Sequence, residues 1–314
     1  MKRKGHLYKN IYNFDNIIQA YNEVCKNTKN KRKVSIFRSY KCMYISRIYE
    51  ILKNREYKVG TYNVFTIYEP KERRIVSQNM QDKVVNHLVA RYILYPALLP
   101  CLIDSNVASR KSMGTSKGLS YFKDFYKKSK IKYRKFYILK CDISKFFASI
   151  NHSILKEKLK KKIKDKEALK IIFDIIDVEE NGLSIGAMTS QVLAIFYLND
   201  MDHFIKEQLK IKYYVRYQDD FLLFHPSKQY LKYCLTQIKN FLEKEDLKLN
   251  KKTRIYKSTS NFIFLGRTKK QKYSKYREIN RKLKKRIYLY KNGNISLMSL
   301  VSSSLCFQNL IQKR

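Results

Sequence analysis

Apolar residues recur at helical spacing over the first part of the chain and in short consecutive runs near its middle. The helical spacing predicts helices over 8–58, 81–98, 117–129, 153–176, 189–210 and 228–246. Runs of β-branched and aromatic residues predict strands over 61–68, 73–76, 136–143, 253–257 and 261–265, with a hairpin over 213–224. From residue 267 onward the chain is basic and is expected to be mostly helical. This mixture predicts an α+β fold in which helices surround strands near the middle of the chain.

Glycines and hydroxyl residues indicate where one of these elements ends and the next begins. Gly182 and Gly186 bracket a loop before an apolar helix. Thr189 or Ser190 is expected to cap that helix, because a hydroxyl oxygen can accept a hydrogen bond from a free backbone N–H of the first turn.

The composition excludes several classes of protein. A chain of 314 residues corresponds to two or three structural units, and a hydrophobic fraction of 44% excludes disorder as a general description. No apolar run is long enough for a transmembrane helix, and no apolar segment follows the basic N-terminus. The six cysteines form no CxxC pair, so neither a zinc site nor a disulfide framework is indicated. A cytoplasmic protein without a membrane partner is expected.

The charge indicates a polyanionic partner. The chain carries 67 Lys and Arg against 26 Asp and Glu, a formal net charge of +41. Nucleic acid is the first candidate, since lysine and arginine neutralise phosphates whatever the sequence; an anionic membrane surface is the competing one. An AT-rich genome would explain the preference for Lys over Arg, but it would not explain the shortage of acids.

Three acids are placed where they could act together. Asp142 ends one apolar strand, and Asp219 and Asp220 lie at the tip of the expected hairpin. If these strands are neighbours in one sheet, three carboxylates meet at one edge, and such hard oxygen ligands hold Mg²⁺. Two such ions would activate a 3′-hydroxyl and stabilise leaving pyrophosphate. The plainer alternative is that Asp219 and Asp220 only form a turn and Asp142 caps a helix.

The residues around these acids favour the catalytic interpretation. The stretches Asp142–Ile150, Gly182–Gln191 and Tyr217–Phe224 resemble motifs A, B and C of reverse transcriptases, in that order. Three further stretches are similar to other parts of the same enzymes. They are Glu69–Val76, like the fingers motif, Gln81–Val85, like the helix after it, and Phe264–Gly266, like the primer-grip turn. The resemblance covers about residues 60–290.

The resemblance implies a right-hand polymerase with fingers, a palm made of an antiparallel sheet with helices, and a short helical thumb. The implied boundaries are 1–135 for an N-terminal extension and fingers, 136–265 for the palm and 266–314 for a basic thumb. The implied partners are template RNA, a DNA or RNA primer, their RNA–DNA hybrid and dNTPs. The implied cofactors are two Mg²⁺ ions, and Mn²⁺ would fit the same oxygen donors.

The resemblance also implies roles for individual residues. The catalytic residues would be Asp142, Asp219 and Asp220, which with the carbonyl of Ile143 form the implied metal site. The implied nucleotide-binding residues are Arg73, Arg74, Phe147, Ile185, Gly186 and Gln191. Phe147 would be a steric gate that collides with a ribonucleotide 2′-hydroxyl, and both arginines would contact the triphosphate. The alternatives are a core phenylalanine and a solvated basic hairpin.

The residues of motif B indicate which type of reverse transcriptase the chain resembles. Its Ile185-Gly186 start and Ser190-Gln191 end look like those of the reverse transcriptases of diversity-generating retroelements, which are error-prone at template adenines and diversify a target gene. Ile185 neither donates nor accepts a hydrogen bond, so checking of the base pair would be looser. Alternatively, Ile185 only packs the palm. The Ser-Gln ending also occurs in other bacterial reverse transcriptases, including phage-defence and abortive-infection enzymes.

The basic C-terminal region is expected to follow a duplex backbone. The candidate residues for contact with phosphates are Lys269, Lys270, Lys272, Arg281, Lys284 and Lys285. A second basic run, Lys156–Lys166, is either a further nucleic-acid surface or a solvated helix face. The resemblance implies a small, basic, oligomeric accessory protein as a partner. A catalytically silent nucleic-acid-binding scaffold is the alternative from another class, although a scaffold has no need of three clustered carboxylates.

Overall fold

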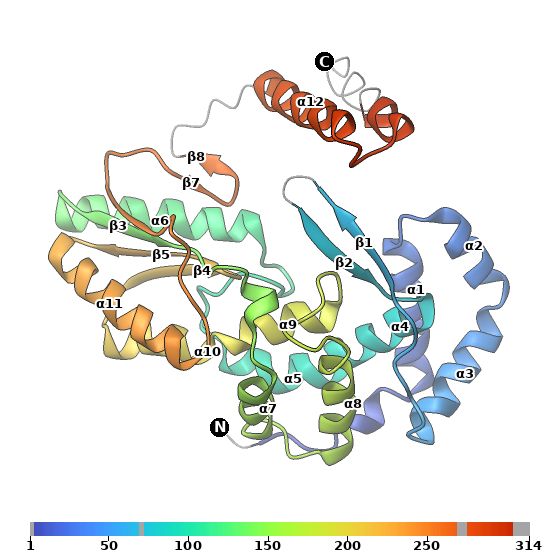
Figure 1. Cartoon of the computed structure of the whole chain (residues 1–314). Helices are drawn as coiled ribbons and strands as arrows, with labels where there is room; N and C mark the ends of the chain where they lie inside the picture. The colour runs from blue at the N-terminus through green and yellow to red at the C-terminus, as the bar shows by residue number, and fades with distance from the viewer. Residues whose placement is uncertain (1–2, 69–71, 269–274, 304–314) are drawn as a thin grey trace. The chain divides into compact units, whose positions relative to one another are not determined.

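The computed structural model describes residues 3–68, 72–268 and 275–303 (Figure 1). The chain divides into two compact units, Met1–Ser260 and Asn261–Arg314. The second unit begins a few residues before position 266, where the sequence places the start of the thumb. The division of the first unit into fingers and palm stays a prediction.

The N-terminal helical region consists of several short helices instead of one run. It contains η1 (Tyr8–Asn10), α1 (Phe14–Asn27), α2 (Lys31–Ser39) and α3 (Lys41–Lys53). The breaks have a local cause: Asn13 and Asn30 each accept a hydrogen bond from the backbone N–H three residues later and so begin a new helix.

A two-stranded hairpin follows, as predicted. β1 (Asn63–Ile67) pairs antiparallel with β2 (Arg73–Ser77), with Val64 opposite Val76. The next predicted helix is confirmed, with a π-helical turn inside it. It consists of α4 (Met80–Val89), η2 (Ala90–Leu94), α5 (Tyr95–Leu98) and a 3₁₀ turn, η3 (Leu99–Cys101).

Asp82 at the start of α4 fixes the chain that enters this hairpin. Its carboxylate accepts hydrogen bonds from the Tyr57 hydroxyl at 2.9 Å, the Gly60 N–H at 3.0 Å and the Asn79 amide at 2.9 Å. Burial raises the pKa of Asp82, and these donors oppose that rise.

Asn86, one turn further along α4, accepts a hydrogen bond from the Thr189 hydroxyl at 2.5 Å. This bond connects α4 to the helix of motif B.

The main sheet has four antiparallel strands in the order β4-β5-β3-β6. The strands are β3 (Tyr137–Cys141), β4 (Tyr213–Tyr217), β5 (Asp220–His225) and β6 (Arg254–Lys257). The predicted hairpin over 213–224 is β4 with β5. The two strands expected over 253–257 and 261–265 do not pair with each other, because β6 joins this sheet beside β3 and the second strand belongs to the C-terminal unit.

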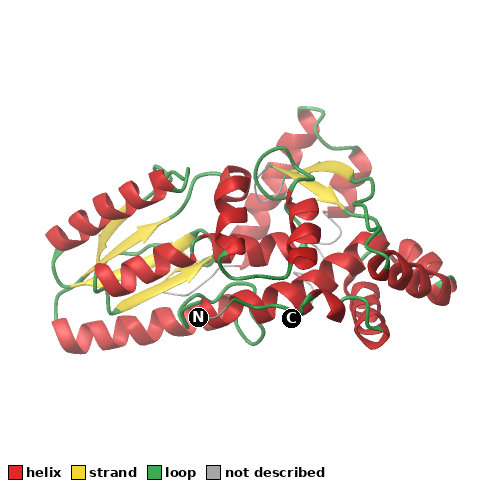
Figure 2. Ribbon diagram, turned by 90° about the horizontal axis from the view of Figure 1, so that it is seen from below, coloured by secondary structure: helices red, strands yellow, loops and turns green. Residues whose placement is uncertain are grey.

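Helices cover both faces of this sheet (Figure 1, Figure 2). On one face, Phe122 of α6 (Thr115–Tyr133) lies against Phe224, with ring centroids 6.1 Å apart. On the other face, Leu231 and Ile238 of α11 (Lys228–Lys244) belong to the same buried cluster as Leu223. Because neighbouring residues of a strand face opposite ways, Leu223 and Phe224 anchor the two layers.

The remaining helices of the first unit are shorter than predicted. They are α7 (His152–Lys160), α8 (Lys166–Ile176), α9 (Met188–Tyr197), α10 (Asn199–His203) and the π-helical η5 (Phe204–Gln208). The expected helix over 153–176 is interrupted because Asp165 caps α8 by accepting from Ala168 N at 3.1 Å. The cap expected from Thr189 or Ser190 is wrong. Ala187 is the N-cap of α9, and the two hydroxyls instead contact Asn86 and Ser184.

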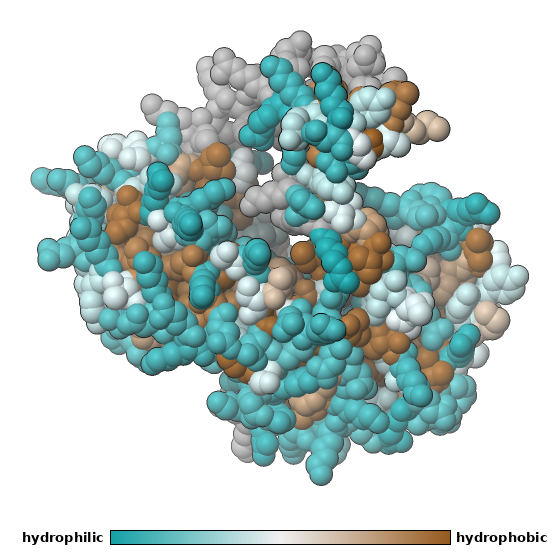
Figure 3. All heavy atoms as spheres, viewed as in Figure 1, coloured by the Kyte–Doolittle hydropathy of each residue, from teal (hydrophilic) through white to brown (hydrophobic). Residues whose placement is uncertain are grey.

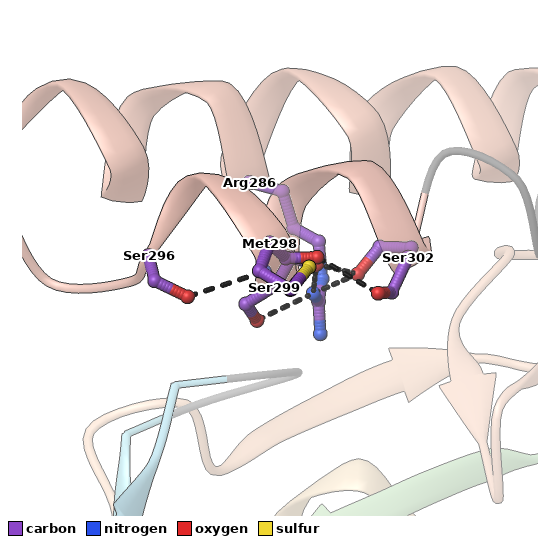
Figure 4. Close-up of a pocket in the computed structure, with 6 residues that line it drawn as sticks. Arg286, Ser296, Met298, Ser299 and Ser302 are labelled. Carbon is purple, nitrogen blue, oxygen red and sulfur yellow. Dashed lines mark hydrogen bonds between the residues drawn. The ribbon is translucent and has the colours of Figure 1, made fainter.

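The C-terminal unit contains a small hairpin and a helical pair. The hairpin is β7 (Ile263–Phe264) with β8 (Arg267–Thr268), and the long helix is α12 (Lys275–Lys291). Residues 297–303 are also helical. Arg286 of α12 holds this segment, because its guanidinium donates to the Ser299 carbonyl at 2.9 Å and also contacts Ser303 (Figure 4).

Hydrophilic side chains cover most of the face seen in Figure 3. Lys156 and Lys158 of the basic run over 156–166 are paired with acids, whereas Lys161, Lys164 and Lys166 are exposed. Lys158 is buried and contacts Glu245 at 2.7 Å and Asp200 at 3.1 Å, and Lys156 contacts Asp177 at 2.6 Å. In the described part of the chain, no helix has the length and apolarity needed to span a membrane.

Candidate active site

The structure brings the three predicted carboxylates to one end of the main sheet. Cys141 at the end of β3 pairs with Phe221 of β5, so the next positions, Asp142 and Asp220, lie opposite each other. Tyr217 pairs with Asp220, which leaves Gln218 and Asp219 as the two-residue turn between β4 and β5. Asp220 is therefore the first residue of β5 and not part of the turn itself. The strand that ends at Asp142 and the strand that begins at Asp220 are therefore neighbours in one sheet, as the sequence argument required.

A buried ion pair holds this turn in place. Gln218 has a φ of 54°, in the left-handed region, and its carbonyl accepts from Arg216 Nη1 at 3.0 Å. The other side of the guanidinium pairs with Asp202, at 2.5 Å from Nη2 and 2.7 Å from Nε, and both side chains are fully buried. Tyr214 donates to the same carboxylate at 2.6 Å. Arg216 thus positions the backbone immediately before Asp219.

Lys140 is paired with one of the carboxylates. Its Nζ donates to both oxygens of Asp220, at 2.8 Å and 3.0 Å. Burial raises the pKa of Asp220 to about 6; Lys140 opposes the rise, while the charges of Asp142 and Asp219 add to it. Asp142 and Asp219 are therefore close enough to influence the ionisation of Asp220.

The carbonyl of Ile143 is directed toward the same place. Asn250 N donates to the Asp142 carbonyl at 2.7 Å, and Ser144 N donates to the Lys248 carbonyl at 2.8 Å. These two bonds flank the bridge between Ile143 and Leu249. In such an antiparallel pair the N–H and C=O of the central residue face away from the partner segment. The Ile143 carbonyl therefore faces the side of β3 on which β5 lies.

These groups fit divalent cations that arrive with substrate. In the described residues, no three Asp, Glu, His or Cys side chains form a ready metal-binding cluster. Mg²⁺ is commonly held by one or two carboxylates together with waters and substrate phosphates, and not by an all-protein cage. Asp142, Asp219 and the Ile143 carbonyl provide oxygen donors of this kind. Asp220, whose two oxygens are both bonded to Lys140, is placed to shape the site electrostatically.

Phe147 lies on η4 (Phe146–Ser149), half-buried and five positions after Asp142. Its carbonyl accepts from Leu183 N at 2.7 Å, which joins motif A to motif B. Gly182 makes this approach possible. Its φ is 73°, and a Cβ there would lie 2.5 Å from the Phe147 carbonyl oxygen. His152 Nε2 lies 2.6 Å from the Gly182 carbonyl and holds the same loop from the other side.

The loop of motif B runs next to the β1–β2 hairpin. Ile185 is half-buried and Gly186 is exposed. Gly186 has a φ of 121°, and a Cβ there would lie 3.8 Å from the Val76 carbonyl of β2. Gln191 is exposed on the first half of α9 and accepts from the Ser109 hydroxyl at 3.3 Å.

Arg73 and Arg74 were both predicted to contact the triphosphate, but the structure describes the side chain of Arg74 alone. Arg73 pairs with Ile67 in the backbone register of the hairpin, and its side chain lies outside the described part. Arg74 donates from Nη1 to Glu179 Oε2 at 2.8 Å, and its side chain is 61% exposed. Arg74 is therefore held by an acid of the loop between α8 and α9. Glu69, Pro70 and Lys71 lie outside the described residues.

The primer-grip candidate is a two-residue hairpin turn in the C-terminal unit. Leu265 and Gly266 have φ values of 49° and 75°, as a type I′ turn requires, and Phe264 is buried. On α12, Arg281 and Lys284 are exposed and Lys285 is half-buried, all on one side of the helix. The other three backbone candidates, Lys269, Lys270 and Lys272, lie outside the described residues.

Sequence reasoning missed four residues of this site. Lys140 had a signal, because it lies two positions before Asp142 on a strand and so shares its face. Arg216 had one too, as a cation inside an apolar strand. Glu179 and Ser109 had none, since each reaches its partner only through the loop it belongs to.

Comparison with known proteins agrees with this arrangement. Residues 51–269 match the family described as Reverse transcriptase (RNA-dependent DNA polymerase). No curated protein matches the sequence.

Two solved telomerase structures are similar in fold. One is apo telomerase from Candida tropicalis, truncated from its C-terminal domain (16% identity, 75% of this chain and 58% of that one, TM-score 0.51). The other is telomerase from Candida albicans with a TWJ fragment of telomeric RNA (15% identity, 68% of this chain and 44% of that one, TM-score 0.49). The chain thus spans less than two thirds of either telomerase. The predicted right-hand polymerase fold is confirmed, and the match over 51–269 shows that this chain belongs to the reverse transcriptase family.

Proposed function

We propose that this protein is an RNA-directed DNA polymerase that extends a DNA or RNA primer with dNTPs on a template RNA. The observation that carries the proposal is the meeting of Asp142, from the end of β3, with Asp219 and Asp220, from the β4–β5 turn, at one sheet edge. A scaffold that only binds nucleic acid has no need of three clustered carboxylates. Of these, Asp220 is paired with Lys140, and Asp219 belongs to a turn whose backbone Arg216 holds.

Different residues of the site would have different roles in nucleotidyl transfer. Asp142, Asp219 and the Ile143 carbonyl would hold two Mg²⁺ ions, which when bound activate the primer 3′-hydroxyl and neutralise the charge on the leaving pyrophosphate. Lys140 keeps the Asp220 carboxylate ionised and oriented beside them. Arg216 keeps the turn from shifting. These contacts fix the geometry before substrate arrives, so little reorganisation remains for the reaction step.

The nucleotide is positioned by the residues around this edge. Arg74 is long and exposed, so its guanidinium can leave Glu179 for the more highly charged triphosphate. Phe147 is held by the bond between its carbonyl and Leu183, and its ring would exclude a 2′-hydroxyl. The basic face of α12 with Arg281, Lys284 and Lys285 would follow the phosphates of an RNA–DNA hybrid.

We also propose the more specific role of a diversity-generating retroelement enzyme. Ile185 supports it, because a half-buried apolar side chain occupies the glycine-flanked loop where a hydrogen-bonding residue would sense the sugar and template. Such an enzyme makes errors opposite template adenines and works with a small, basic, oligomeric accessory protein. The alternative is another bacterial reverse transcriptase, such as a phage-defence enzyme, in which Ile185 only packs.

Sequencing of cDNA distinguishes these two roles. The protein copies an RNA template containing all four bases, alone and with the products of neighbouring genes, and Ile185→Gln is tested in parallel. Errors concentrated opposite adenines in wild type, and fewer of them in Ile185→Gln, support diversification. Rare and evenly distributed errors in both proteins favour the alternative.

A further inference from the structure

Three neutral polar side chains form a hydrogen-bonded line beside the carboxylates. Gln218 Nε2 donates to Ser109 Oγ at 2.9 Å, and Ser109 Oγ donates to Gln191 Oε1 at 3.3 Å. We call these three residues the amide line. They come from the β4–β5 turn, the loop after η3 and the first half of α9. Residues so far apart in sequence meet here only because the fold brings them together.

The backbone holds the middle of the amide line in place. Ser109 has a left-handed φ of 52°. Just before it, Val107 N donates to the Arg216 carbonyl and Arg216 N donates to the Ser105 carbonyl, both at 3.0 Å, so this loop is bonded to the free edge of β4. Arg110 closes the loop with two bonds of 2.9 Å to backbone carbonyls. The serine hydroxyl is therefore positioned before any ligand arrives.

The amide line has a direction. Gln218 uses its amide nitrogen toward Ser109, while its buried Oε1 has no hydrogen-bond partner within the described residues. The Ser109 hydroxyl in turn donates a hydrogen bond to Gln191 Oε1. Gln191 is exposed, and among the described residues its Nε2 donates to nothing. The line therefore ends in an oriented N–H donor at the surface.

The position of the amide line indicates what it contacts. Gln218 immediately precedes Asp219, so their Cα atoms are about 3.8 Å apart. Under the proposed function, Asp219 lies at the primer 3′ end. The part of the bound nucleic acid nearest to the amide line is then the last base pair of the primer and template.

The Gln191 amide is a neutral donor, so it suits the edge of a base better than a charged phosphate. This protein has 67 lysines and arginines for phosphates, yet the line contains no charge. A polymerase must accept every correct pair, so its donor needs an acceptor common to all four. Only the minor groove offers one, in purine N3 and pyrimidine O2. In an RNA–DNA hybrid that groove is wide and shallow.

We propose that Gln191, oriented by Ser109 and Gln218, donates from Nε2 to the minor-groove acceptor of the primer-terminal base pair. This inference rests on the proposed function and adds a specificity-determining contact to it. A correctly paired terminus places N3 or O2 within reach of the donor. A mispaired terminus displaces that acceptor and is extended more slowly.

The test uses a primer that ends in 3-deaza-2′-deoxyadenosine, in which C–H replaces N3, beside a primer that ends in ordinary dA. Single-nucleotide addition by wild type should be roughly three- to tenfold slower on the deaza primer, the effect of one neutral hydrogen bond. Gln191→Met keeps the side-chain length without the donor, so it should be slow on both primers and show no further loss. Gln19→Met is the matched control and should keep the wild-type difference, because Gln19 is an exposed residue of α1 whose amide oxygen likewise accepts from a hydroxyl, that of Tyr92 at 2.7 Å.

Equal rates for wild type on the two primers would overturn the inference, and so would a Gln191→Met protein that keeps the full difference. Equilibrium affinity for the two duplexes, measured without dNTPs, provides a second readout that needs no turnover. If no primer is extended at all, the proposed function is contradicted. The affinities still decide the amide-line contact, because wild type must bind the deaza duplex more weakly and Gln191→Met must not.

Discussion

The ammonium group of Lys140 lies 2.8 Å from one oxygen and 3.0 Å from the other oxygen of Asp220. Both side chains are about one-fifth exposed, so this pair is far less screened than a surface ion pair. Lys140 lies on β3 two positions before Asp142, so the two side chains are expected on the same face of the sheet. Asp220 is thus paired with a cation of the protein itself, and under the proposed function Asp142 and Asp219 bind the ions that come with substrate.

Replacement of Lys140 should reduce turnover more than substrate binding. Lys140→Met leaves Asp220 buried and unpaired beside two other acids, and loss of a charged hydrogen bond predicts a fall in kcat of about 10- to 100-fold. Lys140→Arg should recover part of that loss. Lys128→Met, which removes the exposed pair of Lys128 with Asp124, is the control. Steady-state primer extension with an unchanged kcat for Lys140→Met would contradict this role.

The raised pKa of Asp220 predicts how stability changes with pH. Its pKa of about 6 in the fold lies above the ordinary value of 3.8, so folding favours the protonated form. The stabilisation is complete below about pH 4 and is lost as the pH rises through about 6. Without divalent ions, wild type should therefore lose stability relative to Asp220→Asn between about pH 4 and 6. Parallel thermal unfolding curves for the two proteins over this interval would be inconsistent with a buried, ionising Asp220.

Gly182 should tolerate no side chain. A Cβ there would lie 2.5 Å from the Phe147 carbonyl oxygen and 2.6 Å from Ala148 Cα, and the φ of 73° adds strain. Gly114→Ala is the matched control, since its φ is 114° and nothing lies within 4 Å. Both variants should lose about 1–3 kcal/mol from backbone strain, and Gly182→Ala should lose more because of the collision. Denaturant unfolding measures both; equal losses would show that the loop can move away.

Glu179 should compete with the incoming triphosphate for Arg74. Glu179→Gln removes the competing charge and should lower the KM for dNTP by up to about fivefold, the scale of an exposed ion pair. Arg74→Gln should raise the KM. If Glu179 instead holds Arg74 in its active position, Glu179→Gln raises the KM as well, and this outcome would exclude competition.

Phe147 should govern the choice of sugar. Phe147→Val removes the ring that would collide with a 2′-hydroxyl, so the ratio of kcat/KM for dNTP over rNTP should fall at least tenfold, mostly through a gain with rNTP. Phe146→Leu, a change of the neighbouring buried phenylalanine, controls for packing. A Phe147→Val protein that loses activity with both nucleotides in equal proportion would mark this residue as part of the core.

The parts of this fold set by local pattern could be predicted from sequence. Short runs of apolar residues placed β3, β4 and β5, and the acids at their ends followed from that placement. Helix boundaries were less accurate where a polar side chain chose an unexpected partner. Asp165 interrupts one expected helix by capping the next, and Thr189 bonds to Asn86 instead of capping its own helix.

Contacts between distant loops could not be predicted in this way. Arg74 was expected at a triphosphate, and nothing in its neighbourhood indicated Glu179, because that acid is 105 residues away. The amide line joins Ser109 to Gln191 and Gln218 across 82 and 109 residues. Such pairs depend on tertiary placement, which periodicity and spacing do not encode.

Primer extension on an RNA template with dNTPs and Mg²⁺ tests the central claim most directly. Wild type is compared with Asp142→Asn, Asp219→Asn and the surface control Asp124→Asn, together with their affinities for the primer–template duplex. The account predicts cDNA from wild type and Asp124→Asn, and at least 100-fold less from the other two variants with duplex binding retained. Equal extension by all four proteins, or duplex binding without extension by any of them, would contradict it.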